Sequence, residues 1–246
     1  AETSNVAIEK APLKADFSLD IPAIFAHQGK VNLVFICSPN NPTGTSVGKA
    51  QLKQVLEHFA DSALVVVDEA YIEFDADNTW ATELAAYPNL VVLRTLSKAF
   101  ALAGLRCGFT LANSEVIQSI MKVIAPYPIA DPVAQIAAQA LSQNGLKQMA
   151  EQVEYLSQQK QWVKQQLNQF PELELVGDDK ANFILFRCPQ KQALMDFLVA
   201  NSVLIRDQSK QINLDNCLRI TLGTQLQNEK LLALMASFFK QQETSA

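Results

Sequence analysis

The chain has 246 residues, of which 49% are hydrophobic and 18% are charged, so it can bury the core of one large domain or two modest ones. A disordered or fibrous protein is excluded. The net charge of −5 comes without any basic block, and no apolar run approaches the roughly 20 residues of a membrane-spanning helix. Neither a nucleic acid nor a membrane is therefore expected as a partner.

Cysteine and histidine usage limits the possible metal and thiol chemistry. The chain contains no C-x-x-C pair, which argues against a zinc site and a disulfide framework and favours reduced, buried thiols. With only His27 and His58, His-based metal sites and Ser-His-Asp triads are also disfavoured. The four cysteines are Cys37, Cys107, Cys188 and Cys217.

Glycine is scarce, occurring 8 times where average usage would give about twice as many. No two glycines lie closer than four positions, so the chain has neither a G-x-G dinucleotide fingerprint nor a Walker loop. Phosphate chemistry of those nucleotide-binding kinds is excluded.

The first half of the chain alternates short β-branched runs with amphipathic stretches, which is typical of parallel strands connected by helices. Ser114 is the expected N-cap of one of these helices, with Glu115 in its first turn. The expected strands are residues 31–37, 63–67, 90–93 and 107–111, and the expected helices are residues 49–60 and 114–123.

The pattern changes after Pro126 and Pro128, which interrupt regular structure. We expect an α/β fold with a mostly parallel sheet between helices, followed by a smaller α+β domain at the C-terminal end. The expected domains are residues 1–130, two connecting helices within 131–170, and residues 171–246. The expected elements here are helices at 131–142, 146–170, 191–201 and 227–240, and strands at 182–187, 203–206 and 218–221.

Polar clusters follow several strands, at the end where open α/β sheets bind ligands. The segment from Asn41 to Gly44 is by itself a turn signature, because Pro42 presets one backbone angle and glycine supplies a positive φ. Asp68 and Glu69 follow a continuous apolar run, so a carboxylate here is expected to need a cationic partner or to be a solvated strand end.

Lys98 is the only charged residue within residues 95–105. An apolar environment disfavours the ammonium form of a lysine, which makes its amine a better nucleophile for Schiff-base formation. The alternative is a surface lysine whose stem packs on apolar neighbours. Lys98 alone does not decide between these interpretations.

The order and spacing of these clusters are similar to those of a known enzyme family. The chain resembles the fold-type I pyridoxal-phosphate (PLP) aminotransferases, and among them the histidinol-phosphate aminotransferase family, from about residue 30 to about residue 240. The matching segments are CSPNNPTG (37–44), VDEAY (67–71), TLSKAFALAGLRCG (95–108), LIRD (204–207) and LRITLGT (218–224).

The resemblance implies a site for PLP. Lys98 would bind the cofactor covalently and then move the proton between the substrate Cα and the cofactor C4′. Asp68 would pair with the pyridine nitrogen, and Tyr71 and Asn41 would bond the 3′ oxygen. The family's phosphate contacts correspond to Thr95, Ser97 and Arg106.

The resemblance also implies the substrates, which are histidinol phosphate, glutamate and 2-oxoglutarate in histidine biosynthesis. Arg219 corresponds to the arginine that binds the α-carboxylate of the amino-acid substrate. Arg206 corresponds to the residue that recognises the substrate phosphate and, in the second half-reaction, the side-chain carboxylate of glutamate. No metal ligand is implied.

In the family, a preceding N-terminal portion supplies a phosphate-wrapping helix N-terminus, an aromatic ring that stacks on the pyridine, and a tyrosine that reaches across a dimer. This chain lacks those features. We therefore expect it to be the C-terminal two-thirds of a cytoplasmic, homodimeric enzyme, and to be catalytically deficient alone.

Two alternatives remain at this point. One is an enzyme similar to threonine-phosphate decarboxylase, whose family closely resembles this one. The other is a non-catalytic aminotransferase-like module, which the presence of Lys98, Asp68, Tyr71 and the two distal arginines disfavours.

Overall fold

The computed structural model describes residues 5–244. The chain divides into two compact units. The first comprises Ala1–Pro39 and Ser46–Leu146, and the second comprises Asn40–Thr45 and Lys147–Ala246. A short segment from the first half of the sequence therefore belongs to the second unit, and each unit is described by itself.

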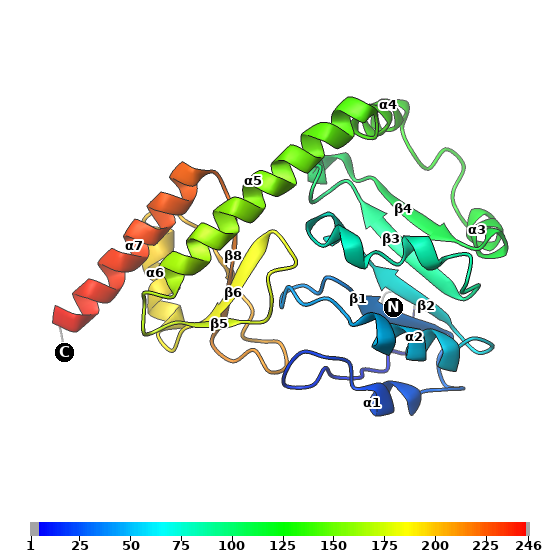
Figure 1. Ribbon diagram of the computed structural model, residues 1–246, viewed down its shortest axis with the longest axis horizontal. Coiled ribbons are helices and arrows are strands. Elements are labelled where there is room, and N and C mark those ends of the chain that lie inside the picture. Colours follow the sequence, from blue (N-terminus) through cyan, green and yellow to red (C-terminus); the bar gives the residue numbers. More distant parts are fainter. Residues whose placement is uncertain (1–4, 245–246) are drawn as a thin grey trace. The chain divides into compact units, whose positions relative to one another are not determined.

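The first unit is built on a four-stranded sheet in the order β1-β2-β3-β4 (Figure 1). β1, β2 and β3 are parallel, as the apolar runs predict, whereas β4 is antiparallel to β3. Because parallel strands end at the same edge, Cys37 pairs with Asp68 and Asp68 with Leu93. The strands are β1 (Leu33–Cys37), β2 (Leu64–Asp68), β3 (Leu90–Thr95) and β4 (Gly108–Ala112).

Helices and 3-10 turns surround this sheet. α2 buries Leu52, Val55 and Leu56, the residues whose helical spacing predicts a buried face. The N-cap of α3 is Asn113, whose side chain accepts the Glu115 N–H at 3.0 Å, so the Ser114 prediction is wrong by one residue. The α-helices are α1 (Ile21–Phe25), α2 (Lys49–His58), α3 (Ser114–Met121) and α4 (Asp131–Ala140), and the 3-10 helices are η2 (Ile72–Phe74), η3 (Ala76–Asn78), η4 (Ala81–Glu83) and η5 (Ala103–Leu105).

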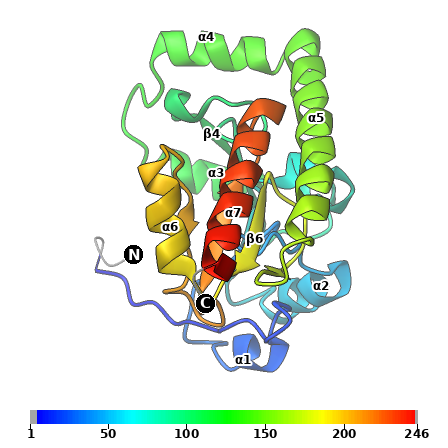
Figure 2. The same cartoon turned by 90° about the vertical axis from the view of Figure 1, so that its left-hand side faces the viewer.

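The second unit has an antiparallel sheet in the order β5-β6-β8-β7, with α6 and α7 packed side by side (Figure 2). Ile184 and Phe186 of β6 and Leu218 and Ile220 of β8 lie in one apolar core with residues of the helices. The elements are α5 (Gln143–Leu167), β5 (Glu174–Val176), β6 (Phe183–Arg187), α6 (Lys191–Ala200), β7 (Arg206–Asp207), β8 (Cys217–Thr221) and α7 (Gln225–Thr244).

The alternation of side chains along β6 and β8 determines which residues lie on the face of the sheet opposite this core. Successive side chains of a strand point to opposite faces, so Leu185 of β6 and Arg219 of β8 point away from the face that holds Ile184 and Ile220. In the ladder, Leu185 is opposite Arg219, and Arg219 is opposite Arg206. Both arginines therefore lie on one face of the sheet.

Three elements differ from expectation. The strand expected at residues 203–206 is only Arg206–Asp207, because the Val203 N–H donates to Leu198 O at 2.8 Å to close α6 and is unavailable for a ladder. α1 and β5 are too short to give a periodic signal. None of the helices within the described residues combines the length and apolar character that crossing a bilayer requires.

Candidate active site

The first group of site residues lies at the carboxyl end of β2 and in the loops beyond β2 and β3. Asp68 is the last residue of β2, and its Oδ1 accepts the Ala70 N–H at 3.0 Å. Tyr71 follows in the same turn and is buried. The Nζ of Lys98 lies 5.3 Å from the centre of the Tyr71 ring, within the range of a cation–π contact. The fold therefore brings Lys98 and Tyr71 together.

Two hydroxyls and an arginine lie at the end of β3 and in the loop after it. Thr95 Oγ1 and Ser97 Oγ are 2.8 Å apart, and the Ser97 N–H donates to Thr95 Oγ1 at 3.1 Å. Arg106 is exposed, has a φ of +54°, and donates from Nη1 to Ala103 O at 3.1 Å. Within residues 5–244, no hydrogen bond joins Arg106 to either hydroxyl.

The return of the chain from Lys98 to Arg106 has a packing cause. Phe100, Leu102 and Leu105 pack against the cluster of Leu96, Cys107 and Ala137. The Leu96 N–H donates to Cys107 O at 3.1 Å, which fixes the start and the end of the excursion beside each other. This hydrogen bond holds Cys107 beside the end of β3, and Arg106 directly precedes Cys107 in the sequence.

Glu69, which sequence reasoning treated only together with Asp68, is the centre of a buried charged cluster. Its side chain has an exposed fraction of 0%. Its carboxylate forms a salt bridge with Arg94, with 2.8 Å to Nε, and accepts hydrogen bonds from the Thr79 hydroxyl at 3.0 Å and the Trp80 N–H at 2.5 Å. Asp68 forms no salt bridge within the part of the chain that the structure describes. The expected cation therefore belongs to Glu69, and Asp68 is left for another partner.

Arg94 also contacts Glu73, with 3.3 Å between Nη1 and Oε1. Burial raises the pKa of Glu73 above its ordinary value, although Arg94 opposes this shift. The signal that could have revealed the cluster is Arg94 itself, a charged residue inside the otherwise apolar strand β3. The cluster links the segments that follow β2 to the end of β3.

The second group lies in the second unit and contains the two expected anion-binding arginines. The guanidinium of Arg219 lies 4.9 Å from the ring centre of Phe183, and its Nη1 donates to Asn41 Oδ1. Arg206 stands directly across the ladder from Arg219. Like charges opposite each other on one face are unfavourable without an anion between or beside them.

Asp207, the residue that follows Arg206, already has hydrogen-bond partners within the protein. The carboxylate of Asp207 bonds Lys191 Nζ at 2.8 Å and the Ser209 hydroxyl at 2.5 Å. Burial opposes the shift, but these hydrogen bonds lower the pKa of Asp207 to about 2. Arg206 itself is exposed and forms no ion pair among the residues that the structure describes. Its guanidinium is thus available to an external anion.

Asn41 sits on a tightly bonded turn. The Gly44 N–H donates to Asn40 O at 2.8 Å, and Gly44 has a φ of +67°, as the turn signature predicts. The side-chain oxygen of Asn41, which the resemblance assigns to the cofactor, accepts a hydrogen bond from Arg219. Asn41 therefore joins the arginine group through a contact 178 positions apart in sequence.

Comparison with known proteins places the chain in a family. A family model described as Aminotransferase class I and II matches residues 1–235. A protein named histidinol-phosphate aminotransferase from Pseudoalteromonas atlantica is 67% identical over 245 residues, which is 100% of this chain and 66% of that protein. The chain thus spans slightly less than two thirds of the length of this curated relative.

Solved structures show the same fold. The histidinol-phosphate aminotransferase from Clostridium acetobutylicum matches with a TM-score of 0.87 and 25% identity over 95% of this chain and 71% of that chain. The enzyme of that name from Sinorhizobium meliloti, in complex with pyridoxal-5′-phosphate, matches with a TM-score of 0.84 and 22% identity, covering 96% and 65%. The expected α/β fold is confirmed, and the chain belongs to the class I and II aminotransferase family.

Proposed function

We propose that the chain belongs to a PLP-dependent enzyme that transfers the amino group of L-histidinol phosphate to 2-oxoglutarate, forming glutamate. The observation that carries the proposal is the 67% identity to a protein of that name, which extends over 245 residues and so includes every site motif. A threonine-phosphate decarboxylase has no comparable support, because the solved structure of that name is only 22% identical to this chain.

The residues present suit PLP by the chemistry of their donors. When bound, PLP supplies an electrophilic carbon for amines and a ring that accepts electrons. Lys98 offers an amine and Asp68 offers a carboxylate. Thr95 and Ser97 offer two adjacent hydroxyls, and together with the guanidinium of Arg106 they would bind the cofactor phosphate. Tyr71 and Asn41 would bond the 3′ oxygen.

Asp68 is suited to keep a proton on a ring nitrogen. The Ala70 N–H holds Oδ1, which orients the carboxylate and leaves Oδ2 for a cationic partner. Since Glu69 takes Arg94, the carboxylate of Asp68 is not neutralised by that cation. The ion pair of Asp68 would then form with the cofactor rather than within the protein.

Lys98 is suited to move a proton at the substrate Cα. Its Nζ lies 5.3 Å from the centre of the Tyr71 ring, a contact that limits where the side chain can point. General acid–base catalysis requires the amine to give and take a proton from a fixed position. Tyr71 would supply that restraint.

The two arginines would select the anionic substrates. Glutamate carries two carboxylates, of which we assign the α-carboxylate to Arg219 and the side-chain carboxylate to Arg206. Histidinol phosphate carries a phosphate ester, which we assign to Arg206, because a guanidinium binds phosphate and carboxylate oxygens in a similar forked geometry. The register of Arg206 and Arg219 on neighbouring strands supports a shared anion-binding face.

We also propose that the complete protein acts as a homodimer. Large apolar side chains of the first unit remain exposed, among them Phe35 at 67%, Val123 at 84% and Tyr127 at 97%. Apolar side chains that are exposed in one part of a protein can be covered by a second copy, and a dimer would bury some of these. Analytical ultracentrifugation of the complete protein tests the proposal, and a monomer at micromolar concentration would contradict it.

The function is tested with the complete protein that carries this chain, expressed in a strain that lacks its own histidinol-phosphate aminotransferase. We expect growth without histidine, and no growth with Lys98→Ala. Carbon dioxide release from threonine phosphate, with no transfer from histidinol phosphate, would establish the decarboxylase instead. Growth supported by Lys98→Ala would contradict a catalytic role altogether.

A further inference from the structure

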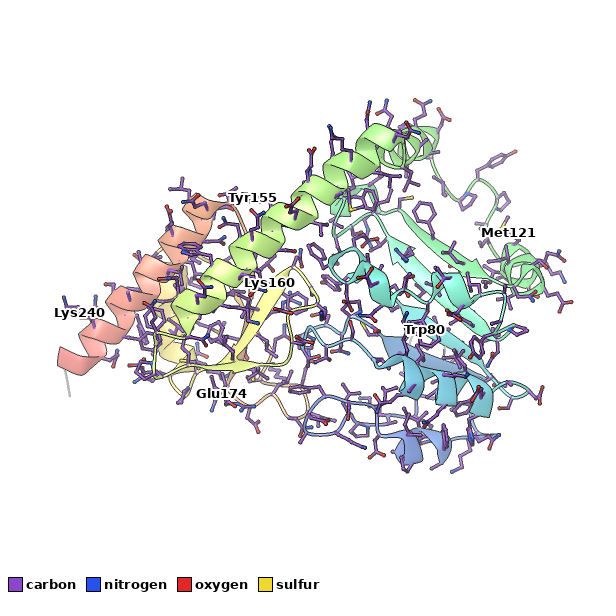
Figure 3. The ribbon with its side chains drawn as sticks, viewed as in Figure 1. Trp80, Met121, Tyr155, Lys160, Glu174 and Lys240 are labelled. Atoms are coloured by element: carbon purple, nitrogen blue, oxygen red, sulfur yellow. The ribbon has the colours of Figure 1, made fainter. Side chains whose placement is uncertain are left out.

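Lys160 is a buried lysine outside the predicted site. It lies on α5 with an exposed fraction of 3%, on the side that faces β6 (Figure 3). Its Nζ donates to the backbone carbonyl of Ala181 at 2.7 Å and to that of Asp179. Burial lowers the pKa of Lys160, and the nearby Asp179 opposes the shift. A buried ammonium is costly unless its bonds are satisfied, so these contacts constrain the loop strongly.

The loop that Lys160 holds connects β5 to β6 and reaches the turn that carries Asn41. The Asp178 N–H donates to Thr43 O at 2.8 Å, and the Lys180 N–H donates to Gly44 O at 3.0 Å. These amides alternate along the chain with the two carbonyls that Lys160 binds. The loop is thus bonded on one side to α5 and on the other to the turn.

Two glycines allow this close approach. A Cβ at Gly177, which has a φ of +76°, would collide with the Thr43 carbonyl, and a Cβ at Gly44 would collide with the Asp178 carbonyl. Backbone contact at this distance leaves little freedom to either segment. A displacement of the loop would therefore be transmitted to the turn.

Both ends of this arrangement reach Arg219. The turn presents Asn41, which accepts a hydrogen bond from the guanidinium. Ala181, whose carbonyl Lys160 holds, lies two residues before Phe183, and the Phe183 ring lies under the same guanidinium. Asn41 and Phe183, which both contact Arg219, are thus both connected to the loop that the Lys160 ammonium holds.

We infer that Lys160 is a positioning residue for anion binding at Arg219, acting through the 178–181 loop on Asn41 and on Phe183. The inference rests on the proposed function only for the identity of the anion, a substrate carboxylate. A merely structural role would lower stability without a specific effect on carboxylate affinity.

Lys164 provides the matched control. It lies one turn further along α5, with an exposed fraction of 29%, and its Nζ bonds the Asp179 carboxylate at 3.2 Å. It makes no hydrogen bond to the carbonyls of the loop within residues 5–244. Removing it takes a lysine from the same helix and leaves the Lys160 contacts in place.

The experiment uses the PLP-loaded complete protein with four variants, Lys160→Met, Lys160→Arg, Lys164→Met and Gly177→Ala. Binding of glutarate, a dicarboxylate that cannot react, is measured by calorimetry, and hydrogen exchange of the Asp178 and Lys180 amides is measured by NMR. Lys160→Met should weaken glutarate binding about tenfold, the equivalent of about 1.4 kcal/mol, and speed both exchanges. Lys160→Arg should stay within about twofold of the wild type, as should Lys164→Met.

Gly177→Ala keeps Lys160 but separates the loop from Thr43, so it should reproduce the weakened binding and decides the matter if Lys160→Met does not fold. Glutarate affinity unchanged in Lys160→Met or in Gly177→Ala would overturn the inference, as would an equal loss in Lys164→Met. Because glutarate binding requires no turnover, a failure of the proposed reaction with histidinol phosphate is seen separately.

Discussion

Within the described residues, each unit buries one charged side chain beside its candidate site residues, and the two charges are stabilised differently. In the first unit, the Glu69 carboxylate is paired with the Arg94 guanidinium and two further donors. In the second unit, the Lys160 ammonium is held by backbone carbonyls. The first arrangement joins the ends of two strands, whereas the second fixes a loop. Loss of the first should therefore affect stability most, and loss of the second should affect ligand affinity most.

The largest expected effect concerns a residue outside both buried clusters. Lys98→Ala should lower kcat of the complete protein by at least about 10²–10⁴-fold, the usual contribution of a positioned acid–base group. Its melting temperature should change little, because Lys98 is half-buried and contacts the Tyr71 ring without a salt bridge in the described residues. Steady-state kinetics and thermal melting check both statements. Near-normal turnover would remove Lys98 from the mechanism.

Glu69→Ala tests the buried pair directly. Because it leaves Arg94 without its main counter-ion, we expect the free energy of unfolding to fall by about 3–5 kcal/mol. Urea denaturation measures this change. The double variant Glu69→Leu with Arg94→Met should recover part of the loss, since it leaves no unpaired guanidinium, although Glu73 also loses its contact with Arg94. If the double variant is less stable than Glu69→Ala, the ion pair is not the reason for the loss.

Arg219→Lys should act on affinity instead of stability. A lysine keeps the positive charge but loses the forked donors that bond Asn41 and the flat face that lies over Phe183. We expect glutarate to bind about tenfold more weakly, measured by calorimetry. Arg187→Lys is the control, because Arg187 lies on β6 of the same sheet and bridges Glu174. An equal loss in both variants would show a general effect of charge geometry.

The smallest expected effect is a pH dependence around Lys160. Burial opposes the shift, but hydrogen bonds from Gln161 and Lys164 lower the pKa of Asp179 to about 2 from 3.8. A carboxyl with a lowered folded-state pKa stabilises the fold above its unfolded value, and this stability is lost as the pH falls from about 4 through 2. Asp179→Asn should flatten that part of a stability–pH curve measured by chemical denaturation. An unchanged slope in the variant would assign the acid sensitivity to other groups.

Much of the fold follows from local patterns, since β2 and β3 are apolar runs with buried neighbours on both faces and α2 has helical spacing. The site loops were also predictable, because polar residues at the ends of parallel strands meet at one edge of the sheet. The antiparallel direction of β4 was not, since its sequence does not record which way the chain returns.

The burial of Lys160 and the contact between Asn41 and Arg219 could not be predicted, for a different reason. Lys160 lies in a glutamine-rich stretch that reads as a solvated helix face, and its partners Asp179 and Ala181 arrive from about 20 positions away. The Asn41–Arg219 contact joins opposite ends of the chain. Such contacts depend on tertiary packing, which local periodicity does not encode.

The central claim is most directly tested by following the cofactor absorbance of the PLP-loaded complete protein in single half-reactions. Histidinol phosphate should convert the cofactor from its aldehyde-derived to its amine form, and 2-oxoglutarate should reverse the change with release of glutamate. Lys98→Ala should show neither conversion on the same timescale. A wild-type protein whose spectrum does not respond to histidinol phosphate, or responds without reversal by 2-oxoglutarate, would contradict the account.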